Sequence, residues 1–388
     1  MSVGLAVWCA GTSVASCVYY VRALLGGRHL SWLERLTPRE PERWPRLSVV
    51  IPACNEGESL RSAIATLLGQ DYTDLELMLI DDRSSDATGR IADELAAADP
   101  RVVALHVAEL PPNWLGKVHA LEVGTRAARG EWLLYTDADV HFAPGALRRA
   151  VAWAIEERLD HLTVAPELHA ASFWHDATQA AFATAYLQRT RAERAGRPGS
   201  RAYVGIGAFN LVRREFFERT SGFDWLRLEV LDDVGLGLMV TRHGGRSRLA
   251  LGLHQVEVRW YGSLREMARG LEKNLFAFVG HYRLWRAVAV AAAVAAFVLG
   301  PFAALVHPSW PVVALGTAAL LSLLSYAALV SLAIGRSFLV LLAQPLGQLL
   351  LAGMLVRSAV ACTRRGGVSW RGTTYGLDAL RAGQRVRF

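Results

Sequence analysis

The chain reads EWLLYTDADV at residues 131–140, an apolar run that ends in two aspartates, Asp137 and Asp139. This pattern predicts a buried strand that delivers two carboxylates to one end of a sheet. Mg²⁺ is typically held by one or two carboxylates together with substrate phosphates. The motif therefore indicates a metal-bound diphosphate and, with it, a nucleotide-sugar donor. A plain polar turn after a strand is the alternative, and the rest of the chain has to decide between them.

Strands and helices alternate before and within this region. Four short β-rich runs predict strands, at residues 47–52, 75–80, 102–107 and 131–136. Apolar residues at helical spacing between them predict amphipathic helices. Such alternation is typical of a parallel α/β sheet that binds ligands at the carboxyl ends of its strands. A second acidic pair, Asp81 and Asp82, follows the 75–80 strand, so two acidic clusters fall at one edge and favour a binding site.

Apolar residues concentrate at the two ends of the 388-residue chain. Residues 3–21 carry no charge, and because no Lys or Arg precedes Arg22 we interpret them as an uncleaved spanning helix rather than a signal peptide. Three further stretches are long enough to span a bilayer, at about residues 287–306, 311–334 and 338–361. Pro345 makes the last stretch irregular, which leaves open a re-entrant or interfacial location.

The net charge of +7 lies mainly beside these apolar stretches. Residues 22–46 hold six arginines, and the tail from Arg357 holds seven arginines and Asp378. Basic segments beside apolar helices mark the cytoplasmic face and attract anionic lipid. No nucleic-acid-binding motif accompanies the charge, which argues against a nucleic-acid partner. The four cysteines show no C-x-x-C spacing and suggest neither a zinc site nor a disulfide framework.

Residues 47–56, 80–88 and 130–140 resemble the signature segments of family 2 glycosyltransferases, which have the GT-A fold. The segments WLGK at 114–117 and GVSWRGTTY at 367–375 resemble a membrane-bound branch of that family. This branch includes ceramide glucosyltransferases, hopanoid-associated glycosyltransferases and the carotenoid-modifying diaponeurosporenoate glycosyltransferases. The resemblance implies an α/β GT-A nucleotide-diphospho-sugar transferase domain with one N-terminal and two to three C-terminal membrane-embedded helices.

The resemblance also implies which residues bind the donor. Ala53 and Glu56 would line a uridine pocket, and Asp82 would hydrogen-bond the uracil or ribose. Asp137 would face the ribose, and Asp139 would ligate Mg²⁺ or Mn²⁺.

Two further residues near the donor motifs each have two interpretations. Lys117 would neutralise phosphate or position the donor, or else be a solvated loop lysine. Asp86 fits a helix N-cap better than a role in binding.

The family pattern places the catalytic base in a Glu-Asp pair, which here reads Asp232-Asp233. Asp233 matches the base, Asp232 replaces the Glu, and the alternative is that both aspartates only cap a helix starting there. Gly207 lies in a small-residue segment that would border the sugar and the acceptor, unless it forms a plain turn. Arg259 and Trp260 match half of an acceptor-side motif, with Arg259 suited to phosphate. The missing half argues against synthesis of a polymer.

Residues 263–281 alternate bulky apolar and charged side chains at helical spacing. They predict an amphipathic helix in the headgroup region, with packing inside a soluble domain as the alternative. Five segments result: a membrane helix (1–25), a cytoplasmic catalytic domain (45–260), the interfacial helix (261–285), membrane helices (286–361) and a basic tail (362–388). Three C-terminal spans would put the Arg-rich tail outside, so we expect one stretch, 338–361, not to cross.

The sequence as a whole predicts a metal-dependent, inverting glycosyltransferase in the cell membrane. It would move a hexose, glucose by preference, from a UDP-sugar to a membrane lipid. Two alternatives stay open: a processive polysaccharide synthase, and a non-catalytic membrane protein that binds nucleotide or lipid.

Overall fold

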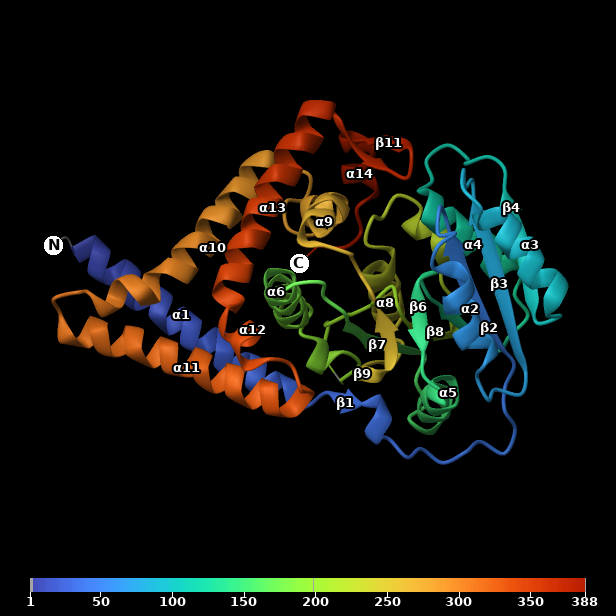
Figure 1. The fold of residues 1–388 in the computed structure, drawn as a ribbon, viewed down its shortest axis with the longest axis horizontal. Helices are drawn as coiled ribbons and strands as arrows, with labels where there is room; N and C mark the ends of the chain where they lie inside the picture. Colours follow the sequence, from blue (N-terminus) through green and yellow to red (C-terminus); the bar gives the residue numbers. More distant parts are fainter. Residues whose placement is uncertain (1–2, 198, 388) are drawn as a thin grey trace. The chain divides into compact units, whose positions relative to one another are not determined.

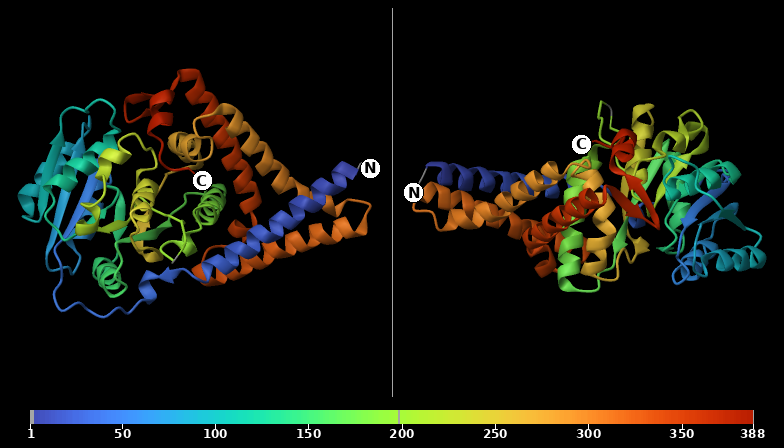
Figure 2. Two further views of the ribbon diagram at one scale, coloured as in Figure 1. Left: turned by 180° about the vertical axis from the view of Figure 1, so that it is seen from behind. Right: turned by 90° about the horizontal axis from the view of Figure 1, so that it is seen from above.

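The computed structural model describes residues 3–197 and 199–387 and divides into two compact units. The sheet unit comprises residues 30–169, 190–259 and 369–388, and the helical unit comprises residues 1–29, 170–189 and 260–368. The chain therefore leaves the sheet unit twice, after His169 and after Arg259. Each unit is described by itself below (Figures 1 and 2).

The sheet unit is built on nine strands in the order β1-β9-β7-β8-β5-β2-β3-β4, with β6 paired to β9. Their bounds are β1 Ser31–Trp32, β2 Leu47–Ala53, β3 Leu75–Asp82, β4 Val102–Val107, β5 Trp132–Tyr135, β6 Val140–Phe142, β7 His161–Leu168, β8 Asn210–Arg213 and β9 Ser247–Val258. Every residue of β2 and β3 is buried, as expected for parallel strands covered on both faces. The four strands predicted from residues 47–136 are all present.

Helices cover the sheet and follow its strands. They are α2 Leu60–Leu68, α3 Thr88–Ala98, α4 Gly116–Ala127, α5 Ala146–Glu156, α7 Arg214–Phe217 and α8 Asp232–Arg242. Figure 1 shows α2, α3 and α4 beside strands β2 to β4. The tail adds a two-stranded ribbon of β10 (Gly367–Trp370) and β11 (Thr373–Gly376), followed by α14 (Leu377–Gly383).

The sheet is mixed, although the sequence pattern predicts a parallel one. Strands β5, β2, β3 and β4 pair in parallel, as predicted. Strand β8, however, lies antiparallel between β5 and β7. The rule for parallel crossovers applies to strands joined through one covering helix. Strand β8 instead follows a long excursion through α6 (Phe173–Thr190), so the alternating pattern carried no information about its direction.

The helical unit contains the four described helices that are long and apolar enough to cross a membrane. They are α1 Val3–Gly27, α10 Leu284–Leu305, α11 Trp310–Ile334 and α13 Gln344–Arg365. Helices α1 and α11 run side by side in both figures. The irregular third C-terminal stretch is split into α12 (Phe338–Leu342) and α13. Pro345 lies in the first turn of α13, where a missing N–H does not break the helix.

The predicted amphipathic helix is α9, Leu264–Phe278. Ser263 caps its start by accepting a hydrogen bond from the Glu266 backbone N–H, and the Glu266 side chain accepts one from the backbone N–H of Gly262, the residue before the cap. Its apolar residues Met267 and Leu271 are fully buried, and α9 packs against α13 within the helical unit. The apolar face is thus covered by protein, and an interfacial location stays a prediction.

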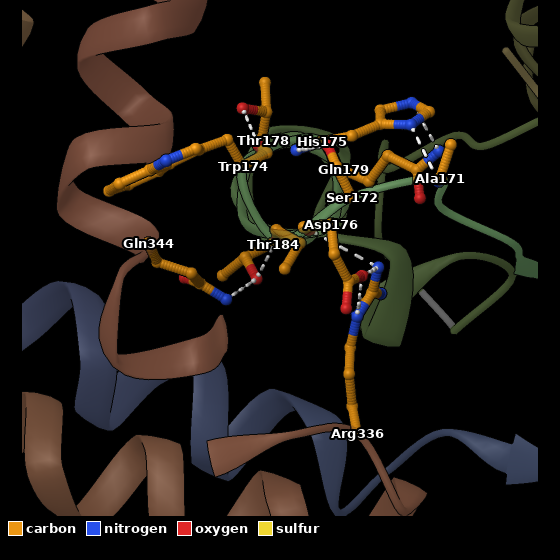
Figure 3. Close-up of polar contacts among 11 residues, drawn as sticks. Ala171, Ser172, Trp174, His175, Asp176, Thr178, Gln179, Thr184, Arg336 and Gln344 are labelled. Carbon is orange, nitrogen blue, oxygen red and sulfur yellow. Dashed lines mark hydrogen bonds and ion pairs between the residues drawn. The ribbon is translucent and has the colours of Figure 1, made fainter. Parts of the chain in front are cut away.

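Polar side chains tie α6 to the other helices of this unit (Figure 3). Arg336, between α11 and α12, donates to the Asp176 carboxylate with a 2.7 Å Nε–Oδ1 distance. Gln344 donates to Thr184 at 3.1 Å and to Tyr326 at 3.0 Å. Polar side chains among apolar helices cost free energy unless they are hydrogen-bonded. These contacts therefore favour one arrangement of α6 against α11 and α13.

Candidate active site

The topology brings the predicted donor residues to one edge of the sheet. Strand β2 lies between β5 and β3, and all three run parallel. Their carboxyl ends are therefore neighbours. Asp137 and Asp139 follow β5, Ala53 ends β2, and Asp82 ends β3. This strand order is consistent with the prediction that the Asp81–Asp82 pair and the Asp137–Asp139 pair lie at one edge of the sheet.

Lys117 joins carboxylates from two separate segments, the one that follows β5 and the start of α8. It lies in the first turn of α4, and its Nζ is 2.7 Å from Asp137 Oδ1 and 3.4 Å from Asp232 Oδ2. The side chain is only 16% exposed, which removes the interpretation of a solvated loop lysine. Burial disfavours its charged form, but the charges of Asp137, Asp232 and Asp233 outweigh burial and hold its pKa above the usual value. Lys117 is therefore a fixed cation among aspartates.

These groups line a small pocket in the sheet unit. Its walls are Lys117, Leu121, Tyr135, Thr136, Asp137, Gly207, Asn210, Phe223, Asp232, Asp233 and Leu236. Four of the residues expected at the donor or acceptor, Lys117, Asp137, Gly207 and Asp232, thus meet the expected base, Asp233, at one cavity.

Gly207 connects the two acidic segments of the pocket. Its carbonyl accepts from the Asp137 N–H at 3.2 Å, and its N–H donates to Asp233 Oδ2 at 2.9 Å. A Cβ at this position would lie 2.7 Å from Asp137 Oδ2 and 3.5 Å from Lys117 Nζ. Glycine is therefore required for the close approach of this backbone to the aspartates.

The surroundings of Asp233 favour the uncharged form of its carboxyl group. Burial and then the neighbouring charge of Asp232 raise its pKa to about 7. Both aspartates lie in the first turn of α8, whose N-cap is Leu231. Asp233 Oδ1 accepts from the Val234 N–H at 2.8 Å, so the residue contacts its own helix start as well as Gly207. A carboxyl group with a pKa near neutrality can accept a proton in a reaction.

Asp139 has the charge environment of a cation ligand. Burial, and then the charges of Asp137 and Glu56, raise its pKa to about 7. These carboxylates repel one another, and a hard divalent cation bound by their oxygens would relieve that repulsion. Carboxylate oxygens are the ligand type that Mg²⁺ and Mn²⁺ prefer, and Asp139 is the ligand that the sequence predicts.

The remaining donor residues surround the ends of β2 and β3. Ala53 is fully buried and pairs in register with Asp81. Asp82 is 2% exposed and forms an ion pair with Arg83, whose Nε lies 2.8 Å from Oδ1. A Cβ on Gly116 would run into this ion pair, so α4 can start here only with glycine. The described contacts do not join Asp82 directly to Asp139 or Asp233.

Arg259 and Trp260 fall in different units, and Asp86 lies beside the start of α3. Arg259 is the last residue of its sheet-unit segment and is exposed, whereas Trp260 belongs to the helical unit. There its ring packs on Phe182, with 4.8 Å between ring centroids. Asp86 accepts hydrogen bonds from the Thr88 N–H at 2.9 Å and the Gly57 N–H at 3.0 Å. It thus contacts the first residue of α3, although the N-cap itself is Ala87, one residue later than the sequence indicated.

Residues of the C-terminal tail, which sequence reasoning assigned no role, contact the donor residues. Arg371 forms an ion pair with Glu56 at 2.9 Å, and the Tyr375 hydroxyl accepts from the Gly116 N–H at 3.3 Å. The fully buried Glu229 accepts from the backbone N–H groups of Arg385 and Val386 at 2.6 and 2.9 Å. The only sequence signal was the family-like 367–375 segment.

Residues 48–220 match the family described as Glycosyl transferase family 2. The match includes β5, Lys117, Asp82 and Asp137, whereas Asp232 and Asp233 lie outside it. The chain carries a family 2 glycosyltransferase domain. This domain is 29% identical over 116 residues to the uncharacterized glycosyltransferase EpsJ of Bacillus subtilis, covering 30% of this chain and 32% of that protein.

A second relative is GalNAc(5)-diNAcBac-PP-undecaprenol beta-1,3-glucosyltransferase of Campylobacter jejuni. It is 34% identical over 104 residues, which are 26% of this chain and 32% of that protein. The chain thus spans about a third of the length of these curated relatives. Their similarity is consistent with the family match and leaves the activity of the whole protein to be proposed.

The fold is similar to that of mannosyltransferase PcManGT from Pyrobaculum calidifontis, solved in complex with GDP-Man and Mn²⁺. The TM-score is 0.54 at 20% identity, and the match covers 92% of this chain and 97% of that one. Together with the family match, this shows the predicted GT-A-like α/β fold accompanied by apolar helices.

Proposed function

We propose that this protein is a metal-dependent, inverting glycosyltransferase that moves a hexose from a UDP-sugar to a membrane lipid. The observation that carries the proposal is the pocket in which Lys117, Asp137, Asp232 and Asp233 meet at the carboxyl edge of the family 2 domain. Ligands of open α/β sheets bind at this edge. The raised pKa of Asp233 and the fixed charge of Lys117 suit proton transfer beside an anionic donor.

The donor nucleotide would lie along the ends of β2 and β3. Glu56 and Asp82 would accept hydrogen bonds from the uridine, and Ala53 would leave room for it. Arg371 would contribute a guanidinium beside Glu56, since arginine binds phosphate oxygens in a bidentate manner. Asp137 would hold the ribose while Lys117 faces the phosphates.

Asp139 would hold the Mg²⁺ or Mn²⁺ of the donor complex. A cation bound there offsets the negative charge that develops on the departing diphosphate. The PcManGT complex with GDP-Man and Mn²⁺ supports a divalent cation on this fold. It also makes GDP-mannose a donor to be tested beside UDP-glucose.

Asp233 would act as the general base. Its carboxylate takes the proton of an acceptor hydroxyl as that oxygen bonds to the anomeric carbon, and the bond from this carbon to the diphosphate oxygen breaks. The configuration at the anomeric carbon is inverted, and the nucleoside diphosphate leaves with the electron pair of the broken bond. Asp232 would keep the pKa of Asp233 high, and Gly207 would hold the reactive carboxylate oxygen through its N–H.

A lipid acceptor is supported by the helical unit. Four described helices are long and apolar enough to cross a membrane, which suits an acceptor that is insoluble in water. The Campylobacter relative is named for an undecaprenol-linked acceptor. We place the domain on the cytoplasmic side, where nucleotide sugars are available. Arg259 and Trp260 would meet the acceptor.

The test is transfer of labelled sugar by the full-length protein in detergent or liposomes. Radiolabelled UDP-glucose, UDP-galactose and GDP-mannose are each supplied with a membrane lipid extract and Mn²⁺, and lipid products are separated and weighed by mass spectrometry. We expect one hexose added per lipid, with one nucleoside diphosphate released. A long polymeric product would instead support the polysaccharide synthase, and no transfer from any donor would support a non-catalytic binding protein.

A further inference from the structure

We propose a second metal site in the sheet unit, for a borderline divalent cation such as Zn²⁺, built from Glu167, His169 and Glu257. One ligating atom from each of these residues lies within 4.8 Å of the others. The Nε2 of His169 is 3.2 Å from Glu257 Oε2. None of the three lines the pocket around Lys117, so this site is separate from the proposed donor site.

Sheet register explains why these side chains share a face. Glu257 on β9 is the register partner of Glu167 on β7 and also of His141 on β6. Register partners project to the same face of a sheet. His169 follows Glu167 by two residues, the spacing that returns a side chain to the same face.

An irregularity in β9 adds another imidazole. The register jumps from Pro166 opposite Gly252 to Glu167 opposite Glu257, so residues 253–256 of β9 bulge out of the ladder with β7. Bulges re-aim side chains and are common beside functional sites. Here the bulged segment brings His254 Nδ1 to 3.5 Å from Glu167 Oε2.

The two carboxylates of this cluster favour the binding of a cation. Two carboxylates directly opposite each other on neighbouring strands repel and destabilise the pairing. A divalent ion between Glu167 and Glu257 removes that repulsion. Imidazole beside carboxylate suits zinc, copper or nickel better than Mg²⁺, which prefers an all-oxygen shell. The exposed position of His169 and His254 leaves room for a water ligand.

The position of the cluster suggests a structural role. His169 and Arg259 are the residues after which the chain leaves the sheet unit, and Glu257 is two residues before Arg259. A cation held by Glu167, His169 and Glu257 would fasten the ends of β7 and β9, where the ladder after the bulge holds only the pairs Glu167–Glu257 and Leu168–Val258. We therefore expect bound Zn²⁺ to stabilise the protein without entering the transfer reaction.

Cobalt is a suitable probe because it replaces zinc and absorbs visible light when it has few ligands. Full-length protein is purified through a tag without histidine, stripped with a chelator and titrated with Co²⁺ in the presence of excess Mg²⁺. We expect saturation at one equivalent, displacement by Zn²⁺, and a rise in melting temperature with Zn²⁺. Both His169→Ala and Glu257→Gln should weaken Co²⁺ binding by roughly tenfold or more.

Three further variants make the result specific. His243→Ala removes an exposed histidine elsewhere in the sheet unit and should bind Co²⁺ normally. Asp139→Asn should also keep the Co²⁺ signal, which separates this site from the donor cation. His169→Cys should retain binding and add a thiolate absorption band. Equal Co²⁺ binding by wild type and His169→Ala, or none by wild type, would overturn the proposal in favour of simple His–Glu ion pairs, whatever the transferase assay shows.

Discussion

The pocket of the sheet unit and the helical unit use their carboxylates in opposite ways. In the helical unit, Asp176 has Arg336 as its partner, and Glu272 pairs with Arg357 and Arg365. In the sheet unit, four aspartates at the edge of the sheet share Lys117. Ion pairs stabilise the packing of helices. A cluster of negatively charged side chains is unfavourable, and proteins keep one mainly where it binds a cation or takes part in a reaction. The same substitution, Asp to Asn, should therefore have opposite consequences in the two units.

The largest effect is expected for Asp233→Asn in the sheet unit. Loss of the base should lower kcat by about 10²–10⁴. The melting temperature should stay equal or rise, because the substitution removes a buried carboxyl group that lies beside Asp232. Release of nucleoside diphosphate and thermal unfolding measure the two quantities. Asp224→Asn, an exposed aspartate of the same unit, is the control, and undiminished turnover by Asp233→Asn would remove this residue as base.

Removal of the donor cation should have the next largest effect. Chelation, or Asp139→Asn, should lower turnover by about 10² or more, since metal assistance contributes several kcal/mol to such reactions. Addition of Mn²⁺ should restore the chelated wild type but not the variant. Mn²⁺ binding measured by electron paramagnetic resonance gives a readout independent of turnover. Normal Mn²⁺ binding by Asp139→Asn would show that another residue holds the ion.

In the helical unit, Asp176→Asn should act on stability. Loss of the partly buried charged contact to Arg336 should cost about 1–3 kcal/mol. The double variant with Arg336→Ala should cost less than the sum of the single ones, because the two residues form one contact. Asp378→Asn breaks an exposed pair with Arg381 and should cost about 0–1 kcal/mol. Thermal unfolding in detergent compares them, and additive losses would contradict the pairing.

Arg371→Ala tests whether the tail contributes to the sheet unit's donor site. We expect the KM for the nucleotide sugar to rise roughly tenfold with a smaller change in kcat, since a charge-assisted phosphate contact contributes about 1.5–3 kcal/mol at most. Arg371→Lys should recover part of the affinity. Arg381→Ala, which alters the same tail away from Glu56, is the matched control. An unchanged KM would limit Arg371 to a structural contact with Glu56.

The smallest effect concerns pH. Only the ionised form of Asp233 accepts a proton, so kcat/KM should fall as the pH drops below about 7, the pKa of that group in the free protein. Asp232→Asn removes the neighbouring negative charge that raises this pKa, and the fall should move to lower pH. Initial rates between pH 5 and 9, at fixed Mn²⁺, test this. A profile of Asp232→Asn that coincides with wild type would exclude Asp232 as the cause.

Local patterns in the sequence were sufficient for much of the architecture. Strands β2, β3 and β4 lie where β-rich runs indicated them, and the apolar stretches became α1, α10, α11 and α13. Strand and helix periodicity depends on residues close together in the chain, so each segment carries its own signal. The helix α6 gave no such signal, because alanines interrupt its pattern and several of its polar residues find partners in distant segments, such as Arg336 and Gln344.

By itself, the sequence determined that carboxylates follow several strands, that Lys117 lies in a family-like segment after the 102–107 strand, and that residues 362–388 are basic. Only the tertiary structure decided that Lys117 reaches both Asp137 and Asp232, that Arg371 meets Glu56, and that Glu167 faces Glu257 across a bulge. Such contacts join residues up to 315 positions apart. They depend on how whole strands pair and pack, which no local pattern of residues encodes.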